Sequence, residues 1–227
     1  MKTKVLAFDL DDTLIDTSGE IVPTATSAAY EAMKEKGLSV EFETFENARR
    51  KGALSISHKM IFRQLAEKYG PPNKIEESTE AGIHSFYNPK LPKTLSLLPG
   101  AQENLEHLKS KYPLFLVTSG SLETQKEKVK RSGLERFFNE IYFIEGVRLK
   151  RKSEAFELIL RKTSCHPREL LAIGNRLSQE IHDAKILGCQ TCYFQYGEHV
   201  GEVSKNQFEI PDFTILQHSE LLEKCQL

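Results

Sequence analysis

The chain has 227 residues, of which 28% are charged, and its formal net charge is −1. This balance of charge gives no basis for binding nucleic acid or an anionic membrane surface. No apolar stretch approaches the roughly 20 residues of a transmembrane helix, and the apolar run near the N-terminus is interrupted by Asp9, which excludes a signal peptide. We expect a cytoplasmic protein without a nucleic-acid or membrane partner.

Residues 5–10 form an apolar run that leads into three carboxylates and a threonine, at Asp9, Asp11, Asp12 and Thr13. This pattern is typical of a buried parallel strand that carries acidic groups at its carboxyl end. Open α/β sheets bind their ligands in the crevice outside such strand ends. Neighbouring carboxylates repel one another unless a cation or a divided protonation state relieves the repulsion. The segment therefore predicts a functional site.

The next part of the chain, from about residue 25 to residue 86, contains no convincing strand. Its apolar spacing predicts amphipathic helices at residues 25–36, 42–51, 57–69 and 75–87. Segments rich in chain-breaking residues bracket it, at residues 16–23 and 88–100. We expect residues 17–94 to form a small all-helical domain, inserted into a larger domain made of residues 1–16 and 95–227.

Strand and helix patterns alternate through the rest of the chain. Apolar runs predict strands at residues 113–118, 140–144, 170–174 and 190–194, and a short edge strand at residues 213–216. Helices are expected at residues 101–111 and 153–162, the second with Ser153 in the N-cap position. This alternation predicts an α/β fold with a doubly wound parallel sheet.

The strand at residues 113–118 leads into Thr118, Ser119 and Gly120. Such a turn can offer the Thr118 hydroxyl and the backbone N–H groups of the next two residues to a phosphate oxygen. The basic cluster at residues 146–153 is either a solvated loop or the source of a fixed cation. A site with several carboxylates and a phosphoryl group needs such a cation.

These motifs resemble those of the haloacid dehalogenase (HAD) superfamily, whose first motif is a hydrophobic strand followed by Asp-x-Asp-x-Thr. The resemblance implies a Rossmann-like HAD core with a helical cap inserted after that motif. In the phosphatase branch it assigns Asp9 as the nucleophile, Asp11 as the general acid and base, and Thr13 as a brace for the loop. The dehalogenases lack an acid at the second position, so Asp11 favours phosphoryl transfer.

The resemblance also implies a lysine just before the helix expected at residues 153–162. Alignment with the family's usual Lys-Pro-x-Pro-Glu-x-Phe selects Lys150, because Glu154 and Phe156 then fall into register. Neither proline is present, so the turn could be shifted and Lys152 is the competing candidate. The selected lysine would hold Asp9 ionised and offset charge on the transferring phosphoryl group.

The fourth motif departs from the family pattern of strand, Gly-Asp and a second Asp. Here Asn175 replaces the first acid and Glu180 the second. Mg²⁺ prefers hard anionic oxygen ligands, so an Asn in this position should weaken metal binding. The resemblance implies a Mg²⁺ site made of Asp9, the backbone carbonyl of Asp11, and Asn175 or Glu180. Asp183 could compensate, but its place further along the helix should turn it partly away.

The resemblance therefore implies a Mg²⁺-dependent phosphoric monoester hydrolase, similar to phosphoglycolate phosphatases, that acts on a small phosphorylated metabolite through an aspartyl-phosphate. Two alternatives stay open. Asn175 is compatible with a weakly active or non-catalytic binding protein, and the same nucleophile serves phosphomutases. The expected helical domain carries a group of basic residues, none of which the spacing identifies as a ligand: Arg49, Arg50, Lys51, His58, Lys59 and Arg63.

Overall fold

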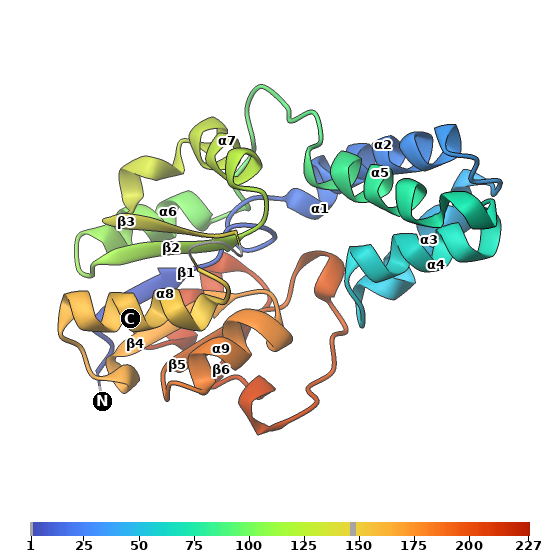
Figure 1. The fold of residues 1–227 in the computed structure, drawn as a ribbon. Helices are drawn as coiled ribbons and strands as arrows, with labels where there is room; N and C mark the ends of the chain where they lie inside the picture. Colours follow the sequence, from blue (N-terminus) through green and yellow to red (C-terminus); the bar gives the residue numbers. More distant parts are fainter. Residues whose placement is uncertain (1, 146–148) are drawn as a thin grey trace. The chain divides into compact units, whose positions relative to one another are not determined.

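The computed structural model describes residues 2–145 and 149–227. The chain divides into two compact units (Figure 1). One, which we call the core unit, comprises Met1–Asp16 and Lys93–Leu227; the other, the helical unit, comprises Thr17–Pro92. The chain therefore returns to the core unit at Lys93, two residues before the boundary expected at residue 95.

The core unit is built on a six-stranded sheet in the order β3-β2-β1-β4-β5-β6, and every neighbouring pair is parallel. From β1 the chain adds β2 and β3 on one side, then returns to add β4, β5 and β6 on the other. The strand order therefore reverses between β1 and β4, which is where open α/β sheets place their ligand crevice. The strands are β1 Val5–Phe8, β2 Leu114–Ser119, β3 Glu140–Ile144, β4 Leu170–Gly174, β5 Gln190–Phe194 and β6 Phe213–Ile215.

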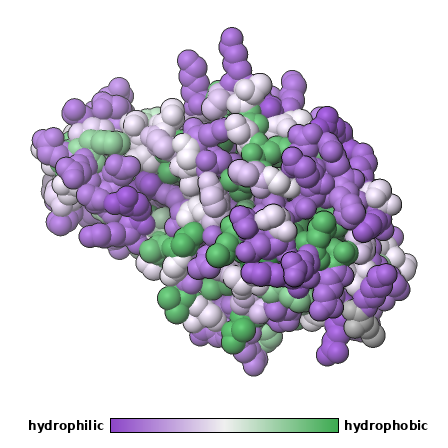
Figure 2. All heavy atoms as spheres, turned by 180° about the vertical axis from the view of Figure 1, so that it is seen from behind, coloured by the Kyte–Doolittle hydropathy of each residue, from purple (hydrophilic) through white to green (hydrophobic). Residues whose placement is uncertain are grey.

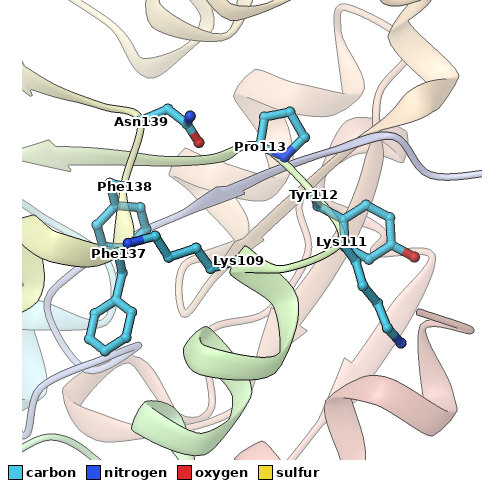
Figure 3. Close-up of a pocket in the computed structure, with 7 residues that line it drawn as sticks. All are labelled: Lys109, Lys111, Tyr112, Pro113, Phe137, Phe138 and Asn139. Atoms are coloured by element: carbon cyan, nitrogen blue, oxygen red, sulfur yellow. The ribbon is translucent and has the colours of Figure 1, made fainter.

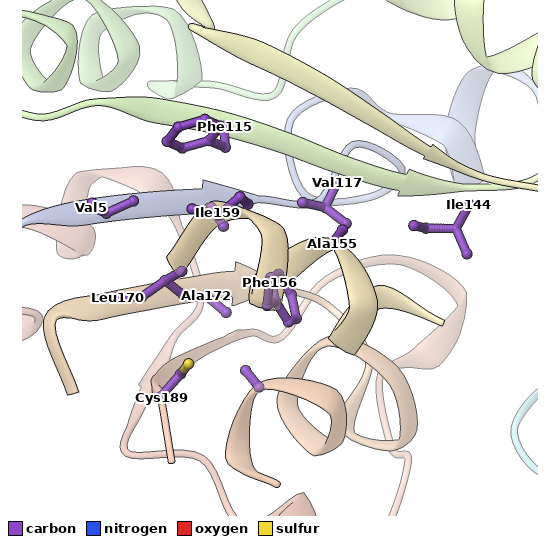
Figure 4. Close-up of a cluster of buried hydrophobic side chains, with 12 residues drawn as sticks. Val5, Phe115, Val117, Ile144, Ala155, Phe156, Ile159, Leu170, Ala172 and Cys189 are labelled. Atoms are coloured by element: carbon purple, nitrogen blue, oxygen red, sulfur yellow. The ribbon is translucent and has the colours of Figure 1, made fainter. Parts of the chain in front are cut away.

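The central strands are buried along their whole length, as the continuous apolar runs predict. Alternate residues such as Val5, Phe115 and Ala172 project from one face of the sheet, where Phe156 and Ile159 of α8 pack against them (Figure 4). Figure 1 shows α6 on the side of the sheet away from α8. The arrangement confirms the predicted α/β fold with a doubly wound parallel sheet.

The helices of the core unit mostly fill the crossovers between parallel strands. They are α6 Ala101–Lys109, α7 Leu122–Ser132, α8 Lys152–Thr163, α9 His182–Lys185 and α10 Leu221–Lys224. The N-cap predicted at Ser153 is wrong. Helix α8 begins at Lys152, and the flanking residue Arg151 makes no side-chain capping bond. The Ser153 N–H instead donates to the Asp183 carboxylate at 3.2 Å.

The helical unit contains the four amphipathic helices that the sequence predicts, preceded by the short helix α1. Its helices are α1 Thr17–Glu20, α2 Val22–Glu35, α3 Phe42–Ala53, α4 His58–Tyr69 and α5 Ile75–Tyr87. Helix α5 packs against α2 and α4, and α3 packs against α4. The enclosed core is aromatic: the Phe45 and Phe62 rings stack with centroids 5.8 Å apart, and Tyr30 meets Phe45 edge-on at 5.4 Å.

The surface is mostly hydrophilic on the face shown in Figure 2, with hydrophobic side chains in small groups. Among the helices of the described residues, none has the length and apolar character needed to cross a membrane. Exposed apolar residues include Val203 and Ile210, in the segment between β5 and β6, and Leu216, directly after β6. Single exposed apolar residues are normal on soluble proteins.

Candidate active site

The carboxylate of Asp9 lies directly beyond the end of β1, at the point where the strand order reverses. Its backbone N–H donates to the Ile173 carbonyl of β4 at 2.9 Å, which fixes the main chain at this point. The Thr13 hydroxyl donates to Asp9 Oδ2 at 3.3 Å. Thr13 is fully buried and Asp9 is only 5% exposed. The loop is thus closed over the acid, and Thr13 lies in the bracing position that the sequence predicts.

Asp12 shapes this loop through its backbone. Its φ of 55° lies in the left-handed region, which is unusual for a residue other than glycine. Its carboxylate packs against Gly197, where an added Cβ would lie 2.2 Å from Asp12 Oδ2. Gly197 also has a positive φ of 77°, so the segment after β5 can approach the loop only with glycine at this position.

Lys152 is the lysine that reaches Asp9. Its ammonium lies 2.5 Å from Asp9 Oδ1 and also forms an ion pair with Glu180 Oε1. The preference for Lys150 is therefore corrected. Lys150 is exposed and lies two residues before the first residue of α8. Its backbone N–H donates to the Glu154 carboxylate. Arg148, another member of the predicted basic cluster, lies outside the described residues.

The protonation of this triad follows from its burial. Removal from water raises the pKa of Asp9 to about 7; the Lys152 ammonium opposes this rise, while Glu180 and Asp11 add to it. Burial disfavours the charged form of Lys152, but its two carboxylate partners outweigh burial and raise its pKa. A lysine that stays charged between two acids is the fixed cation that a phosphoryl-transfer site needs.

Asp183 holds the start of α8 in place. Its Oδ1 accepts from Arg151 at 2.9 Å and its Oδ2 accepts from the Ser153 N–H at 3.2 Å. Acceptance by a buried carboxylate at a helix N-terminus is favourable because the first N–H groups lack partners within the helix. Asp183 therefore positions the lysine-bearing helix, and its orientation toward a metal stays a prediction.

Asn175 directly follows β4, and Glu180 lies within a turn of π-helix at Leu177–Ile181. The Asn175 side-chain nitrogen donates to the Tyr196 carbonyl at 3.2 Å, so its amide oxygen is the atom that can serve as a metal ligand. The Glu180 oxygens accept from Lys152 and from the Arg176 N–H. Gly174 leaves room for this acid, because an added Cβ would lie 2.3 Å from Glu180 Cγ.

The oxygen atoms at these strand ends fit a Mg²⁺ site in which the protein supplies few carboxylate ligands. Among residues 2–145 and 149–227, no three His, Cys, Asp or Glu side chains are grouped as a metal site. The oxygen donors near the reversal point are the Asp9 carboxylate, the Asn175 amide oxygen and main-chain carbonyls. Mg²⁺ is commonly held by one or two carboxylates and completed by water and substrate phosphate. The predicted role of Glu180 as a direct ligand stays a prediction.

The end of β2 supplies the predicted phosphate-binding residues, with one correction. Thr118 is fully buried, and Ser119 is partly exposed at the strand end. The Gly120 N–H donates to the Ile144 carbonyl at 3.2 Å, so in this structure it is engaged within the protein and not offered to phosphate. Gly120 has a φ of 147°, and an added Cβ would lie 3.3 Å from the Gln125 side chain.

Two residues that the sequence motifs did not identify contact Asp11. Lys128 Nζ lies 2.7 Å from Asp11 Oδ1, and Gln125 Nε2 donates to Asp11 Oδ2 at 2.8 Å. Gln125 Nε2 also lies 2.7 Å from the Thr118 hydroxyl. Both residues are on the buried side of α7. A glutamine and a lysine three positions apart on the core-facing stripe of a helix are the signal that could have revealed them.

The side-chain oxygen of Gln125 has no hydrogen-bond partner among the described residues. Its Oε1 is buried without a hydrogen bond to any of the described residues. An unsatisfied buried polar atom costs roughly 1–3 kcal/mol. The amide cannot reverse to satisfy it, because the Ser119 carbonyl and the Asp11 carboxylate around the nitrogen are acceptors. These two acceptors therefore fix the orientation of this side chain at a cost in stability.

A pocket of about 290 Å³ lies at the end of the sheet where the strands begin, opposite to the end that carries Asp9 (Figure 3). It is lined by Lys109 and Lys111 and by residues that directly precede β2 and β3, including Pro113 and Asn139. These are the amino ends of the strands, whereas Asp9, Thr118 and Asn175 lie at carboxyl ends. The pocket is therefore separate from the candidate active site.

The sequence is similar to those of a known enzyme family and of several named phosphatases. A model of the family described as haloacid dehalogenase-like hydrolase matches residues 6–194. The chain is 32% identical to glyceraldehyde 3-phosphate phosphatase of Pyrococcus furiosus, over 98% of this chain and 92% of that protein. It is 27% identical to phosphoglycolate phosphatase of Vibrio parahaemolyticus, over 97% and 95% of the two chains.

Solved structures share the fold at low sequence identity. A predicted phosphoglycolate phosphatase from Haemophilus somnus superimposes with a TM-score of 0.74 at 18% identity, covering 98% of both chains. The HAD-hydrolase YfnB of Bacillus subtilis, in a structure described as bound to magnesium, gives a TM-score of 0.69 at 19% identity and covers both chains completely.

Proposed function

The chain belongs to the haloacid dehalogenase-like hydrolase family, and we propose that it is a phosphatase that hydrolyses a small phosphomonoester through an aspartyl-phosphate on Asp9. One observation carries this proposal: the buried Asp9 carboxylate at the sheet's reversal point is paired with Lys152, which is itself paired with Glu180. An acid held this way at a ligand crevice is equipped to attack an electrophile. Asp11, two residues on, supplies the second carboxylate that hydrolysis needs.

In the first step, an Asp9 carboxylate oxygen forms a bond to phosphorus and the bond between phosphorus and the ester oxygen breaks. Asp11 donates a proton to that leaving oxygen, which departs as an alcohol. The Lys152 ammonium favours the ionised form of Asp9 before attack. The Thr118 hydroxyl can donate to a phosphoryl oxygen, because its own oxygen already accepts from Gln125.

In the second step, Asp11 is the ionised base. It accepts a proton from a water molecule whose oxygen attacks phosphorus, and the bond between phosphorus and the Asp9 oxygen breaks. Orthophosphate leaves, Asp9 returns to its carboxylate form, and Asp11 is again protonated. Lys152 and Glu180 exchange no proton in either step, so their ion pair can persist through the cycle.

We further propose a Mg²⁺ ion as the cofactor, held by the carboxylate of Asp9, the main-chain carbonyl of Asp11 and the amide oxygen of Asn175. When bound, the metal would offset negative charge on the phosphoryl oxygens. Because Asn175 is neutral, this site holds less anionic charge than one with a carboxylate there, and we expect weaker Mg²⁺ binding.

The names of the relatives suggest where to begin the search for a substrate. Glyceraldehyde 3-phosphate and phosphoglycolate, which relatives are named for, are phosphate monoesters with two or three carbons. We propose a substrate of this size class and glyceraldehyde 3-phosphate as the first compound to assay. The relatives share no more than about a third of their residues with this chain, so the assay should include both compounds.

The test is phosphate release from an aryl phosphate and from the two metabolites, with and without Mg²⁺, for the wild type and Asp9→Asn. We expect Mg²⁺-dependent release that falls by at least about 10³-fold in the variant, because the nucleophile is lost. Full activity in Asp9→Asn would exclude Asp9 as the nucleophile. No release by either protein, together with saturable Mg²⁺ binding in calorimetry, would favour a binding protein. Dependence on a bisphosphate activator would indicate a mutase.

A further inference from the structure

Helix α7 presents two buried polar side chains to Asp11, and the steps described above give neither of them a role at that carboxylate. We propose that Gln125 and Lys128 are positioning residues: they fix the Asp11 carboxylate and couple its orientation to that of the Thr118 hydroxyl. This inference rests on the proposed function, in which Asp11 is the acid and base. Neither residue is assigned a contact with substrate.

The geometry of the contact is specific. Gln125 and Lys128 are three positions apart, so they project from the same side of α7 on consecutive turns. Each donates to a different oxygen of Asp11, Lys128 to Oδ1 at 2.7 Å and Gln125 to Oδ2 at 2.8 Å. Two donors on two oxygens prevent rotation of the carboxylate about its terminal torsion.

Burial distinguishes these residues from ordinary surface pairs. Gln125 is 2% exposed and Lys128 is 7% exposed, whereas the neighbouring Lys126 pairs with Glu123 on the surface. Ion pairs on exposed surfaces contribute little, but a buried ammonium needs its partner. Lys128 is therefore committed to Asp11 in a way that the other lysines of α7 are not.

Gln125 adds a link to the phosphate-binding strand end. Its amide nitrogen lies 2.7 Å from Thr118 Oγ1 and 2.8 Å from the Ser119 carbonyl oxygen, in addition to its bond to Asp11. Because Thr118 accepts from this amide, its own hydroxyl proton is directed elsewhere and can meet a phosphoryl oxygen. Gly120 permits this arrangement, since an added Cβ would lie 3.3 Å from the Gln125 side chain.

The two residues should therefore affect different kinetic constants. Loss of Lys128 releases the acid and base alone, so kcat should fall by about 10–100-fold with little change in KM, the cost of a misplaced catalytic group. Loss of Gln125 also releases Thr118, so kcat should fall and KM should rise. We choose Lys128→Met and Gln125→Met, which keep side-chain length, and Lys126→Met as the matched exposed control.

The test is a double-mutant cycle. Lys128→Met is measured alone and in an Asp11→Asn background, with the aryl phosphate as substrate. A residue that acts through Asp11 should have no further effect once Asp11 is replaced, so kcat should change by less than about 2-fold in that background. Equal losses in both backgrounds would overturn the proposal. Lys128→Arg, which keeps the charge, should recover most of the lost kcat.

Unfolding in urea separates this inference from the proposed function. The four proteins are the wild type, Lys128→Met, Asp11→Asn and the double variant. The shifts in their unfolding midpoints should not add, because Asp11 and Lys128 contact each other. If the wild type releases no phosphate but the midpoints are coupled, the proposed function fails and the fixing of Asp11 stands. Additive midpoints would overturn the inference whatever the turnover.

Discussion

The two units of this chain bury different kinds of side chains. At the carboxyl ends of β1 and β4, the core unit buries an acid, a lysine and a second acid: Asp9, Lys152 and Glu180. The core of the helical unit is aromatic and aliphatic, with Phe45 and Phe62 at its centre. Both arrangements are well packed, but only the first places charge where water is excluded.

The difference shows how stability and chemistry are divided within one chain. Apolar burial stabilises a unit through area removed from water and requires no exact geometry beyond good packing. Buried charges contribute little net stability, and they are costly when one partner is missing. We therefore expect variants in the core site to lower turnover, and also stability where a buried charge loses its partner. Variants in the helical core should lower the free energy of unfolding through lost packing.

The largest effect should come from Lys152→Met. Its removal leaves Asp9 and Glu180 buried together without a cation, so we expect kcat to fall about 10³-fold, as for loss of a main electrostatic group. The free energy of unfolding should fall by about 3–5 kcal/mol, because a buried pair is broken. Lys150→Met is the matched control and should stay within about 2-fold of wild type. A larger loss in the control would restore Lys150 as the site lysine.

Phe62→Ala tests the apolar side of the comparison. Phe62 is fully buried and stacks on Phe45, so its truncation should lower the free energy of unfolding by about 3–5 kcal/mol. Urea unfolding followed by circular dichroism measures this change. Met60→Ala, on the same helix at 46% exposure, should cost well under about 1 kcal/mol. Equal losses in the two variants would mean that this cluster is not the core of the helical unit.

A pair of glycine substitutions compares tolerance in the two units. In Gly174→Ala the new Cβ would lie 2.3 Å from Glu180 Cγ, so Glu180 must shift and kcat should fall roughly 10-fold or more. In Gly82→Ala the new Cβ would lie 2.7 Å from Met33 Sδ, which a flexible side chain can relieve, and 3.3 Å from the Phe62 ring, while alanine favours the helix. Gly82→Ala should therefore change stability by less than about 1 kcal/mol. A site that tolerates Gly174→Ala would show that Glu180 does not need its observed position.

The smallest effect concerns pH and the buried His218. Its Nε2 donates to the Thr13 carbonyl at 2.7 Å, Asn104 donates toward Nδ1, and burial lowers its pKa. Below about pH 6.5 this histidine binds a proton in the unfolded chain but not in the folded protein. The free energy of unfolding therefore decreases as the pH is lowered. The slope for one proton is at most about 1.4 kcal/mol per pH unit.

His218→Gln should remove that part of the pH dependence. Urea unfolding between pH 7.5 and 5 measures the slope in both proteins. The exposed His107 is the control, and His107→Gln should keep the wild-type slope. An unchanged slope in His218→Gln would show that another group is responsible for the loss of stability in acid.

Much of the fold could be predicted because the apolar periods are strong. Three of the six strands, at residues 140–144, 170–174 and 190–194, have the predicted bounds. Buried parallel strands give continuous apolar runs, and amphipathic helices give a stripe with a period near four. Helix starts were less predictable. Without the usual prolines, α8 begins one residue earlier than expected, at Lys152.

That shift explains why the sequence ranks Lys150 above Lys152 as the site lysine, whereas Lys152 is the one that contacts Asp9. The choice between Lys150 and Lys152 depends on where the first helical turn begins, and this is fixed by the bonds from Asp183 to Arg151 and Ser153, some thirty residues away in the chain. Gln125 and Lys128 were missed for a similar reason. Their spacing on α7 can mark them as buried polar residues, but it does not identify their partner Asp11, which is 114 and 117 residues away.

Local spacing and composition are enough to predict the alternation of strands and helices, the inserted helical segment and the acids after the first strand. The folded chain is needed to show which lysine meets Asp9, that Glu180 pairs with that lysine, and that α7 supplies two donors to Asp11. These are contacts between distant segments, and the cost of burying charge makes them specific. A buried charge must find a partner, but the sequence does not state where that partner will come from.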